Sequence, residues 1–303
     1  MIIKSFIKKG SGFFGQDIES WTKASNEVKD ILDFSIQAEK GHLSSFFKMY
    51  FPYPPKKILD GGCGVGAHVI AYRKLGYDII GVDFSNDIIR RIKKEVSEDV
   101  PVYAADLTAL PFNDSYFDCC LLAGVIEHFE EGPYAVLKEI RRVLKKDGLL
   151  LVAVPYINIL RWIYFSIFPI KKKSNFLQKR CNSCQLETDV PSGYNFCEYF
   201  FDVHSLIPYF SANNFLLQEA FPVDFLWGEI GLIFKKAIER YSARKVHENR
   251  IGSIKRSFTK RLIYDFLITE NRNNLFFRFP LALLNHLSGH MVLLIAKPAS
   301  LHL

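Results

Sequence analysis

The residues ILDGGCGVG, at positions 58–66, set the architecture of this chain: a short apolar run ends at an acid and is followed by glycines 62, 64 and 66. Residues 65–75 then show the apolar spacing of a helix, and YDIIGVD (77–83) is typical of a second buried strand. A strand, a glycine-rich turn and a helix open a βαβ unit, whose turn lies where ligands bind. Glycines there let the backbone approach a ligand and leave the helix amino terminus open.

The same alternation continues along the chain and predicts a doubly wound, mostly parallel α/β sheet of seven strands. Ser85 is the expected cap of a helix through residues 86–96, and a further helix is expected over 134–144. After residue 155 the alternation stops, and one more helix is expected over 202–214. The remaining strands are expected at 100–106, 117–124, 149–155, 215–221 and 290–298.

These elements divide the chain into four parts. Residues 1–55 are expected to form an N-terminal helical cap, and residues 56–155 the ligand-binding core. Residues 156–200 are expected to form an aromatic and basic insertion, a helical lid after the fifth strand. Residues 201–303 are expected to complete the same domain, with a basic helical insertion over about 230–285 between the sixth and seventh strands.

The composition excludes several classes of protein. With 303 residues, 49% of them hydrophobic, the chain is neither disordered nor collagen-like, and six scattered cysteines do not make a secreted disulfide framework. The N-terminus lacks the apolar region of a signal peptide, and Pro155, Asn158 and Arg161 interrupt the longest apolar stretch. A cytoplasmic chain without a membrane-spanning helix is expected.

The glycine loop alone leaves the ligand open. Gly62-x-Gly64-x-x-Ala67 also satisfies a dinucleotide fingerprint, with Asp83 placed to bind ribose hydroxyls, so a NAD-dependent oxidoreductase is one alternative. Asp60 directly before the loop would repel a pyrophosphate but suits a cationic ligand. Asp106, at the end of the third strand, could accept a hydrogen bond from an adenine amino group.

Four segments together resemble the class I S-adenosylmethionine-dependent methyltransferases, specifically the type 11 small-molecule group: ILDGGCGVG (58–66), GVDFS (81–85), AADLTALPFNDSYFDCCLLAGVIEHF (104–129) and VLKKDGLLLVAVP (143–155). Residues 200–223 are similar to the helix and strand that follow the family's fifth strand. The resemblance implies a Rossmann-like methyltransferase fold with S-adenosyl-L-methionine as the cofactor. Gly61 departs from the family pattern, which usually has an aliphatic residue there.

The resemblance also assigns cofactor-binding residues. Asp60 and the loop backbone of residues 62–64 would face the methionine part, Asp83 the ribose hydroxyls, and Phe84 the adenine ring. Asp106 would bind the adenine amino group beside the Leu107 backbone. The alternative for Asp83 and Asp106 is a purely structural role, in a turn or as a helix cap. The full predicted set is Asp60, Gly62, Cys63, Gly64, Gly66, Asp83, Phe84, Asp106, Leu107, Leu122 and Gly124.

His128 is the best candidate for a general base, because methyl transfer to a hydroxyl requires loss of its proton and imidazole titrates near neutral pH. Glu127 beside it is expected to be structural. The function favoured is methyl transfer to a small-molecule acceptor, most simply a hydroxyl of a saccharide or lipid-linked intermediate. The alternative outside enzymes is a non-catalytic cofactor-binding protein.

The acceptor-side segments are unusual. INILRWIYFSIFPI (157–170) precedes three lysines, and residues 235–261 are strongly basic. A lid helix packed on the domain is the favoured interpretation of the first segment and a solvated helical face that of the second, while a peripheral contact with an anionic membrane surface is the alternative for both. No nucleic-acid module accompanies this charge, so nucleic acid is not an expected partner. Cys181, Cys184, Cys197 and His204 form a loose zinc-like pattern, but free thiols are favoured and no metal site is predicted.

Overall fold

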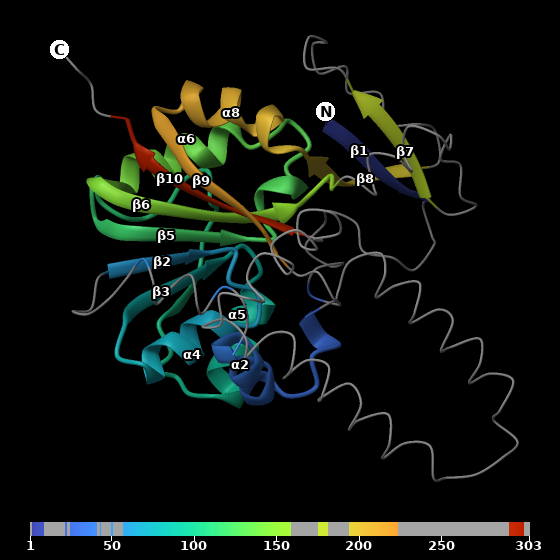
Figure 1. Ribbon diagram of the computed structural model, residues 1–303. Helices are drawn as coiled ribbons and strands as arrows, with labels where there is room; N and C mark the ends of the chain where they lie inside the picture. The colour runs from blue at the N-terminus through green and yellow to red at the C-terminus, as the bar shows by residue number, and fades with distance from the viewer. Residues whose placement is uncertain are drawn as a thin grey trace, which may run out of the picture.

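The computed structural model describes residues 2–8, 22, 25–40, 43, 50, 57–158, 175–180, 194–223 and 291–299. Its centre is a seven-stranded sheet with the order β4-β3-β2-β5-β6-β10-β9 (Figure 1). The seven strands are β2 (Lys57–Gly61), β3 (Asp78–Asp83), β4 (Val102–Ala104), β5 (Phe117–Ala123), β6 (Leu144–Pro155), β9 (Phe215–Val223) and β10 (Met291–Pro298).

The predicted doubly wound fold is confirmed. The five strands from β4 to β6 pair in parallel, whereas β10 runs antiparallel to both β6 and β9. The chain order reverses between β2 and β5, which makes the carboxyl ends of these strands a topological switch point, where open α/β sheets bind ligands.

Helices cover both faces of the sheet, as Figure 1 shows. On one face lie α2 (Ile31–Lys40), α4 (Ala67–Lys74) and α5 (Asn86–Glu95), and on the other α6 (Tyr134–Val143) and α8 (Val203–Ala212). Ser85 caps α5 as predicted, because its Oγ accepts a hydrogen bond from the Ile88 N–H. Asp202 caps α8 in the same way through the Ser205 N–H.

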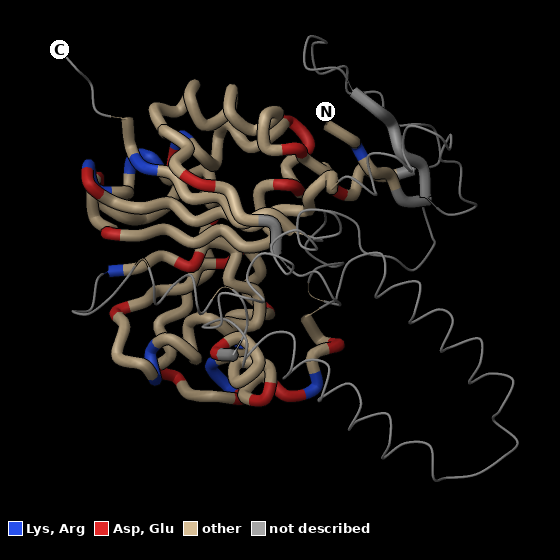
Figure 2. The backbone as a smooth tube through the Cα atoms, in the orientation of Figure 1, with Lys and Arg blue, Asp and Glu red and all other residues tan. Residues whose placement is uncertain are grey.

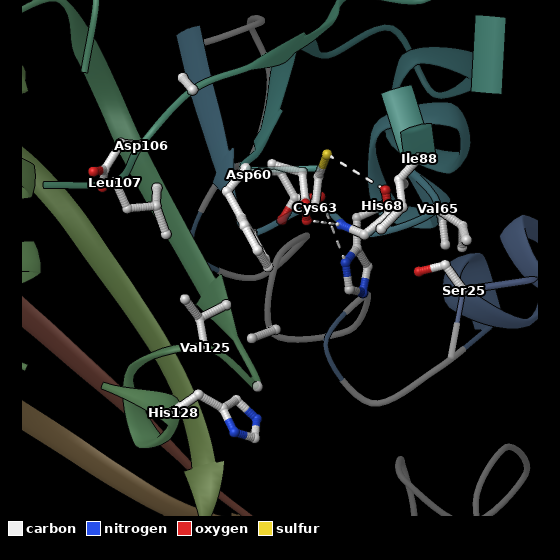
Figure 3. A pocket seen from close by; sticks show the side chains of 18 of the residues that line it. Ser25, Asp60, Cys63, Val65, His68, Ile88, Asp106, Leu107, Val125 and His128 are labelled. Atoms are coloured by element: carbon white, nitrogen blue, oxygen red, sulfur yellow. Dashed lines mark hydrogen bonds and ion pairs between the residues drawn. The ribbon is translucent and has the colours of Figure 1, made fainter. Parts of the chain in front are cut away.

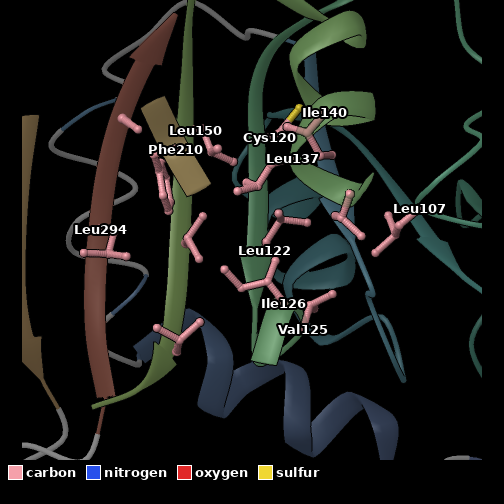
Figure 4. Close-up of a cluster of buried hydrophobic side chains, with 14 of the residues drawn as sticks. Leu107, Cys120, Leu122, Val125, Ile126, Leu137, Ile140, Leu150, Phe210 and Leu294 are labelled. Carbon is pink, nitrogen blue, oxygen red and sulfur yellow. The ribbon is translucent and has the colours of Figure 1, made fainter. Parts of the chain in front are cut away.

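The strands alternate between two apolar cores. Along β5, Cys119 and Leu121 pack toward α4 and α5, while Cys120 and Leu122 pack toward α6 and α8. Figure 4 shows the second of these clusters, with Leu137 and Ile140 of α6 above the sheet. A strand buried on both faces needs apolar residues at successive positions, which explains why the sequence of the central strands is continuously apolar.

A second, three-stranded antiparallel sheet contains residues that were expected in the N-terminal helical cap and in the insertion over 156–200. It has the order β7-β1-β8 and consists of β1 (Ile2–Lys8), β7 (Asn175–Arg180) and β8 (Tyr194–Phe201). Residues 2–8 were predicted within the helical cap, but they form the central strand of this sheet; the helix of that region is α2. β8 also extends one residue past position 200, the expected end of the insertion. At its end the Ile157 N–H donates to the Phe201 carbonyl at 2.8 Å.

Charged residues in the described part of the chain lie mainly at strand ends and on helices, and most strand centres of the large sheet are free of them, with Glu219 in the middle of β9 as an exception (Figure 2). The predicted membrane-contact segment 157–170 (beyond residue 158) and the basic stretch 235–261 lie outside the described residues, as do Cys181 and Cys184. Among the residues that are described, no helix combines the length and the apolar character needed to cross a bilayer. Within the same ranges, no three His, Cys, Asp or Glu side chains are grouped to hold a metal ion.

Candidate active site

A cavity of about 690 Å³ lies at the carboxyl ends of β2, β3, β4 and β5 (Figure 3). The adjacent ends of parallel strands bring together side chains that are far apart in the sequence. All but two of the predicted site residues line this cavity, namely Asp60, Gly62, Cys63, Gly64, Asp83, Phe84, Asp106, Leu107, Gly124 and His128.

Asp60 is the most unusual residue of the cavity. Its side chain is 2% exposed, and its Oδ2 atom is buried without a hydrogen-bond partner. The His68 ring lies near it, with Nδ1 3.8 Å from that oxygen. Burial, and then the nearby charge of Asp83, raise the pKa of Asp60 from 3.8 to about 7. An unpartnered buried carboxylate oxygen fits a ligand with a positive charge.

Asp83 holds the glycine loop in place. Its Oδ2 accepts a hydrogen bond from the Gly64 N–H at 2.9 Å, and its Oδ1 accepts one from the Ser85 N–H at 3.0 Å. Burial raises its pKa, although these backbone donors oppose the rise. The turn role considered for Asp83 is therefore present, in a carboxylate that also lines the cavity.

Asp106 likewise combines a turn role with a place in the cavity wall. Its Oδ1 accepts hydrogen bonds from the backbone N–H and the hydroxyl of Thr108, both at 2.8 Å. The side chain of Phe84, 42% exposed, and that of Leu107, 7% exposed, line the same cavity. An exposed aromatic ring next to two carboxylates can stack on a planar base while the acids bind its polar edge.

Two predicted cofactor residues lie outside the cavity. Leu122 is fully buried in the core below α6, with its Cδ2 2.7 Å from the place where a Cβ on Gly61 would lie. The departure from the family pattern at Gly61 thus gives Leu122 its space. Gly66 is the N-cap residue of α4 and faces Ile92 of α5 rather than the cavity.

The glycines of the loop differ in what surrounds them. Gly62 has φ +72°, and a Cβ there would lie 2.6 Å from Cγ2 of Val125. Gly64 has φ +52°, and no atom lies within 4 Å of its Cβ position. Because Gly64 lines the cavity, that open space is part of the cavity.

This difference predicts two distinct effects of alanine. Gly62→Ala should destabilise the fold by about 2–4 kcal/mol through the clash and the positive φ. Gly64→Ala should cost only about 1–2 kcal/mol of backbone strain but weaken ligand binding about tenfold or more, since its methyl group enters the cavity. Urea denaturation and calorimetric titration of both variants check this, and equal affinity of Gly64→Ala and the wild type would contradict it.

His128 ends the short 3-10 helix η1 (Ile126–His128) on the side of the cavity away from the glycine loop (Figure 3). Its Nδ1 is 3.0 Å from the Cys197 carbonyl, which fixes Nδ1 as the protonated nitrogen. Burial lowers the pKa of His128, so the ring is neutral near pH 7. Burial also raises the pKa of Glu127 well above its usual range, and Glu127 is not among the residues that line the cavity.

The sequence did not point to several residues of the wall. The place of His68 in the wall depends on the helical register of α4, because His68 lies in the first turn after the glycine loop and faces Asp60. Ser25, Val28 and Phe34 come from the N-terminal segment, and Glu130 from the loop after η1. No local pattern could have placed the N-terminal residues there, because their contacts with the core are long-range.

The comparisons with known proteins agree with this geometry. Residues 59–152 match the family model described as a methyltransferase domain. This part of the chain is a class I S-adenosylmethionine-dependent methyltransferase domain. S-Adenosylmethionine is therefore its cofactor, and the NAD-dependent alternative is set aside.

The domain is similar to curated proteins over only part of their length. It is 34% identical over 100 residues to demethylmenaquinone methyltransferase from Renibacterium salmoninarum, covering 33% of this chain and 41% of that protein. It is also 34% identical over 103 residues to the uncharacterized methyltransferase YodH of Bacillus subtilis, covering 33% of this chain and 43% of YodH. The chain thus spans less than half the length of these relatives.

The fold of the methyltransferase domain is shared with solved structures. A chain from the complex between the Haloferax volcanii Trm112 methyltransferase activator and a methyltransferase superposes with a TM-score of 0.50. The match covers 93% of this chain and 98% of that one at 13% sequence identity, so it concerns the fold.

Proposed function

We propose that this protein transfers the methyl group of S-adenosylmethionine to a small-molecule acceptor, a hydroxyl of a saccharide or lipid-linked intermediate. One observation carries the proposal: Asp60, whose Oδ2 has no hydrogen-bond partner, Asp83 and Asp106 lie at the carboxyl ends of three neighbouring strands in one cavity, with His128 in the wall of the same cavity. This arrangement offers acids to a cationic nucleoside and an imidazole to its reaction partner.

The residues of the chain fit this cofactor. Asp60 would bind the ammonium group of the methionine part, which gives its buried oxygen the partner it lacks. Asp83 would accept hydrogen bonds from the ribose hydroxyls, using the lone pairs of its oxygens that are not already bonded to the Gly64 and Ser85 amides. Phe84 would stack on adenine, and Asp106 would accept from its amino group through Oδ2. The cofactor supplies an activated methyl group bonded to a positively charged sulfur.

His128 would act on the acceptor. With its Nδ1–H held by the Cys197 carbonyl, the ring is oriented with Nε2 as the basic nitrogen. A neutral imidazole can take the proton of a hydroxyl as that oxygen attacks the methyl carbon. The apolar residues Val125 and Phe129 line the same side and would exclude water from the reacting atoms.

We also propose that the protein acts in the cytoplasm and contacts an anionic membrane surface peripherally. The support for this part is the sequence alone, because the aromatic segment and the basic stretch lie outside the described residues. It agrees with an acceptor carried on a lipid.

Calorimetric titration tests the cofactor assignment directly. S-Adenosylmethionine and S-adenosylhomocysteine should both bind to the wild-type chain, and NAD should produce no heat. Incubation with cofactor labelled in the methyl group, together with saccharide and lipid-linked saccharide acceptors, then tests transfer. Binding without transfer to any acceptor would favour the non-catalytic alternative, and no heat with either nucleoside would refute the proposal.

The variant His128→Asn separates catalysis from binding. The asparagine amide can still donate to the Cys197 carbonyl, but it has no basic nitrogen. We expect methyl transfer to fall about 100-fold or more, with unchanged affinity for S-adenosylhomocysteine. His204→Asn is the matched control, because His204 does not line the cavity and should have no effect. Full activity of His128→Asn would exclude a general-base role.

A further inference from the structure

The N-terminal segment of residues 25–34 forms part of the cavity wall although it lies far from the core in sequence. Ser25, Val28 and Phe34 of this segment line the cavity together with residues of the glycine loop and of α5. Figure 3 shows Ser25 on the same side as Val65 and Ile88, opposite Asp106. Any ligand in the cavity is therefore enclosed partly by residues 25–34, which are not part of the sheet.

One side chain fastens this segment to the core. Arg91 of α5 donates from one terminal nitrogen to the Ser25 carbonyl at 2.5 Å and from the other to the Val28 carbonyl at 2.6 Å. Glu95 fixes the guanidinium itself, accepting from Nε at 2.8 Å. The Arg91 side chain is 16% exposed, so these bonds are partly shielded from water. A planar guanidinium presents its donors in a rigid fork that can hold two carbonyls and a carboxylate at once, a geometry that the single nitrogen of a lysine does not reproduce.

A second contact points the same way. The hydroxyl oxygens of Thr22 and Ser85 lie 2.9 Å apart, which links the chain just before the segment to the residue that caps α5. Both attachments start from α5, whose N-terminal turn also contributes Ile88 to the cavity. Helix α5 thus contacts both the N-terminal segment and the cavity at the strand ends.

We propose that Arg91 is a positioning residue for the cofactor. By holding the Ser25 and Val28 carbonyls, it keeps the segment closed over the cavity, so that cofactor release requires the segment to leave Arg91. Arg91 touches no ligand itself; it sets how long the bound nucleoside stays. The inference rests on the proposed function, because it presumes that the cavity holds S-adenosylmethionine and its product.

The test compares dissociation rates of S-adenosylhomocysteine by surface plasmon resonance for the full chain and its variants. For Arg91→Ala we expect a dissociation rate about tenfold faster than the wild type, since two charge-assisted hydrogen bonds to the wall are lost. Arg91→Lys keeps the charge but loses the planar fork, so its rate should lie between the two. Arg90→Ala is the matched control: Arg90 is the next residue of α5, is 76% exposed and pairs with Asp87, so the rate should not change.

The variant Thr22→Val tests the same inference in case the Arg91 variants fail to fold. It removes only the hydroxyl contact with Ser85 and leaves α5 intact, and we expect dissociation a few-fold faster at an unchanged melting temperature. In the wild type, bound S-adenosylhomocysteine should also slow hydrogen exchange of the amides in residues 25–34, an effect that Arg91→Ala weakens. Dissociation rates for Arg91→Ala and Thr22→Val equal to that of Arg90→Ala would overturn the inference. A wild-type chain that binds no S-adenosylhomocysteine would instead refute the proposed function, and this inference with it.

Discussion

Replacing Asp60 by asparagine is expected to weaken S-adenosylmethionine binding about 100-fold and, at the same time, to stabilise the ligand-free protein. The loss of affinity follows because a cationic group in the cavity would lose its buried carboxylate partner. The gain in stability follows because the ligand-free fold buries that carboxylate without a hydrogen bond to Oδ2 and close to Asp83. The two effects have opposite signs, which a general folding defect could not produce.

The size of the stability gain follows from the pKa. The Asp60 carboxyl has a pKa of about 7 in the folded chain, against a usual 3.8. Because the unfolded chain then releases this proton at lower pH than the folded chain, the free energy of unfolding falls as the pH rises from about 4 to 7. Above pH 7 the full penalty applies, so Asp60→Asn should stabilise the ligand-free chain by up to about 4 kcal/mol at pH 8. Asp78→Asn, an exposed acid at the other end of the neighbouring strand β3, is the control and should change neither quantity.

The same group should make binding depend on pH. Between pH 5.5 and 7 a larger fraction of Asp60 ionises as the pH rises, so the wild-type affinity for S-adenosylmethionine should rise about tenfold, while the affinity of Asp60→Asn stays constant. Two other groups near this carboxylate do not imitate the effect: the pKa of His68 is lowered to about 4, and burial raises that of the Cys63 thiol. Burial also raises the pKa of Asp83, and any slope that remains in Asp60→Asn measures the share of Asp83. Titration calorimetry across this range measures the slope, and a flat wild-type profile would contradict the assignment of Asp60.

The central sheet and most of its site could be predicted because their causes are local. The loop at residues 58–66 and the acids that end the neighbouring strands are short-range patterns, and a parallel sheet brings such strand ends together without further information. Asp60, Asp83 and Asp106 therefore reach the cavity as expected. Leu122 does not line the cavity, because adjacent residues of a strand face opposite sides, and the sequence of a strand buried on both faces does not tell which side is which.

The small sheet could not be predicted because its causes are long-range. Residue 2 pairs with residue 180 on one side and with residue 201 on the other, without any hairpin turn between the strands. Isolated from these partners, residues 2–8 have no strong preference that would separate strand from helix, since pairing energy comes from cross-strand contacts. The same reason hid the role of the segment around Ser25, whose position depends on a guanidinium 66 residues away.

Glu130→Ala is expected to destabilise the protein by about 3 kcal/mol, whereas Lys4→Met, which removes the other partner, should change stability by less than about 1 kcal/mol. Lys4 of β1 is 1% exposed, and its Nζ lies 2.8 Å from Oε1 of Glu130, a residue of the cavity wall. Loss of Glu130 leaves an ammonium buried between the rings of Phe6 and Phe196, whose centroids are 5.3 and 5.0 Å from Nζ. Loss of Lys4 leaves only a carboxylate that is 26% exposed and can be hydrated.

Urea denaturation of the single variants and of the double variant measures this asymmetry. The double variant should recover most of the stability lost in Glu130→Ala, because a methionine fills the aromatic site without a charge. Glu131→Ala is the matched control, since Glu131 lines the same cavity and is exposed. If Glu130→Ala and Glu131→Ala prove equally stable, the pair does not anchor the loop. The rings around Nζ, or the Tyr199 hydroxyl that donates to the Glu130 carbonyl at 2.6 Å, would then have to hold the small sheet against this wall of the cavity.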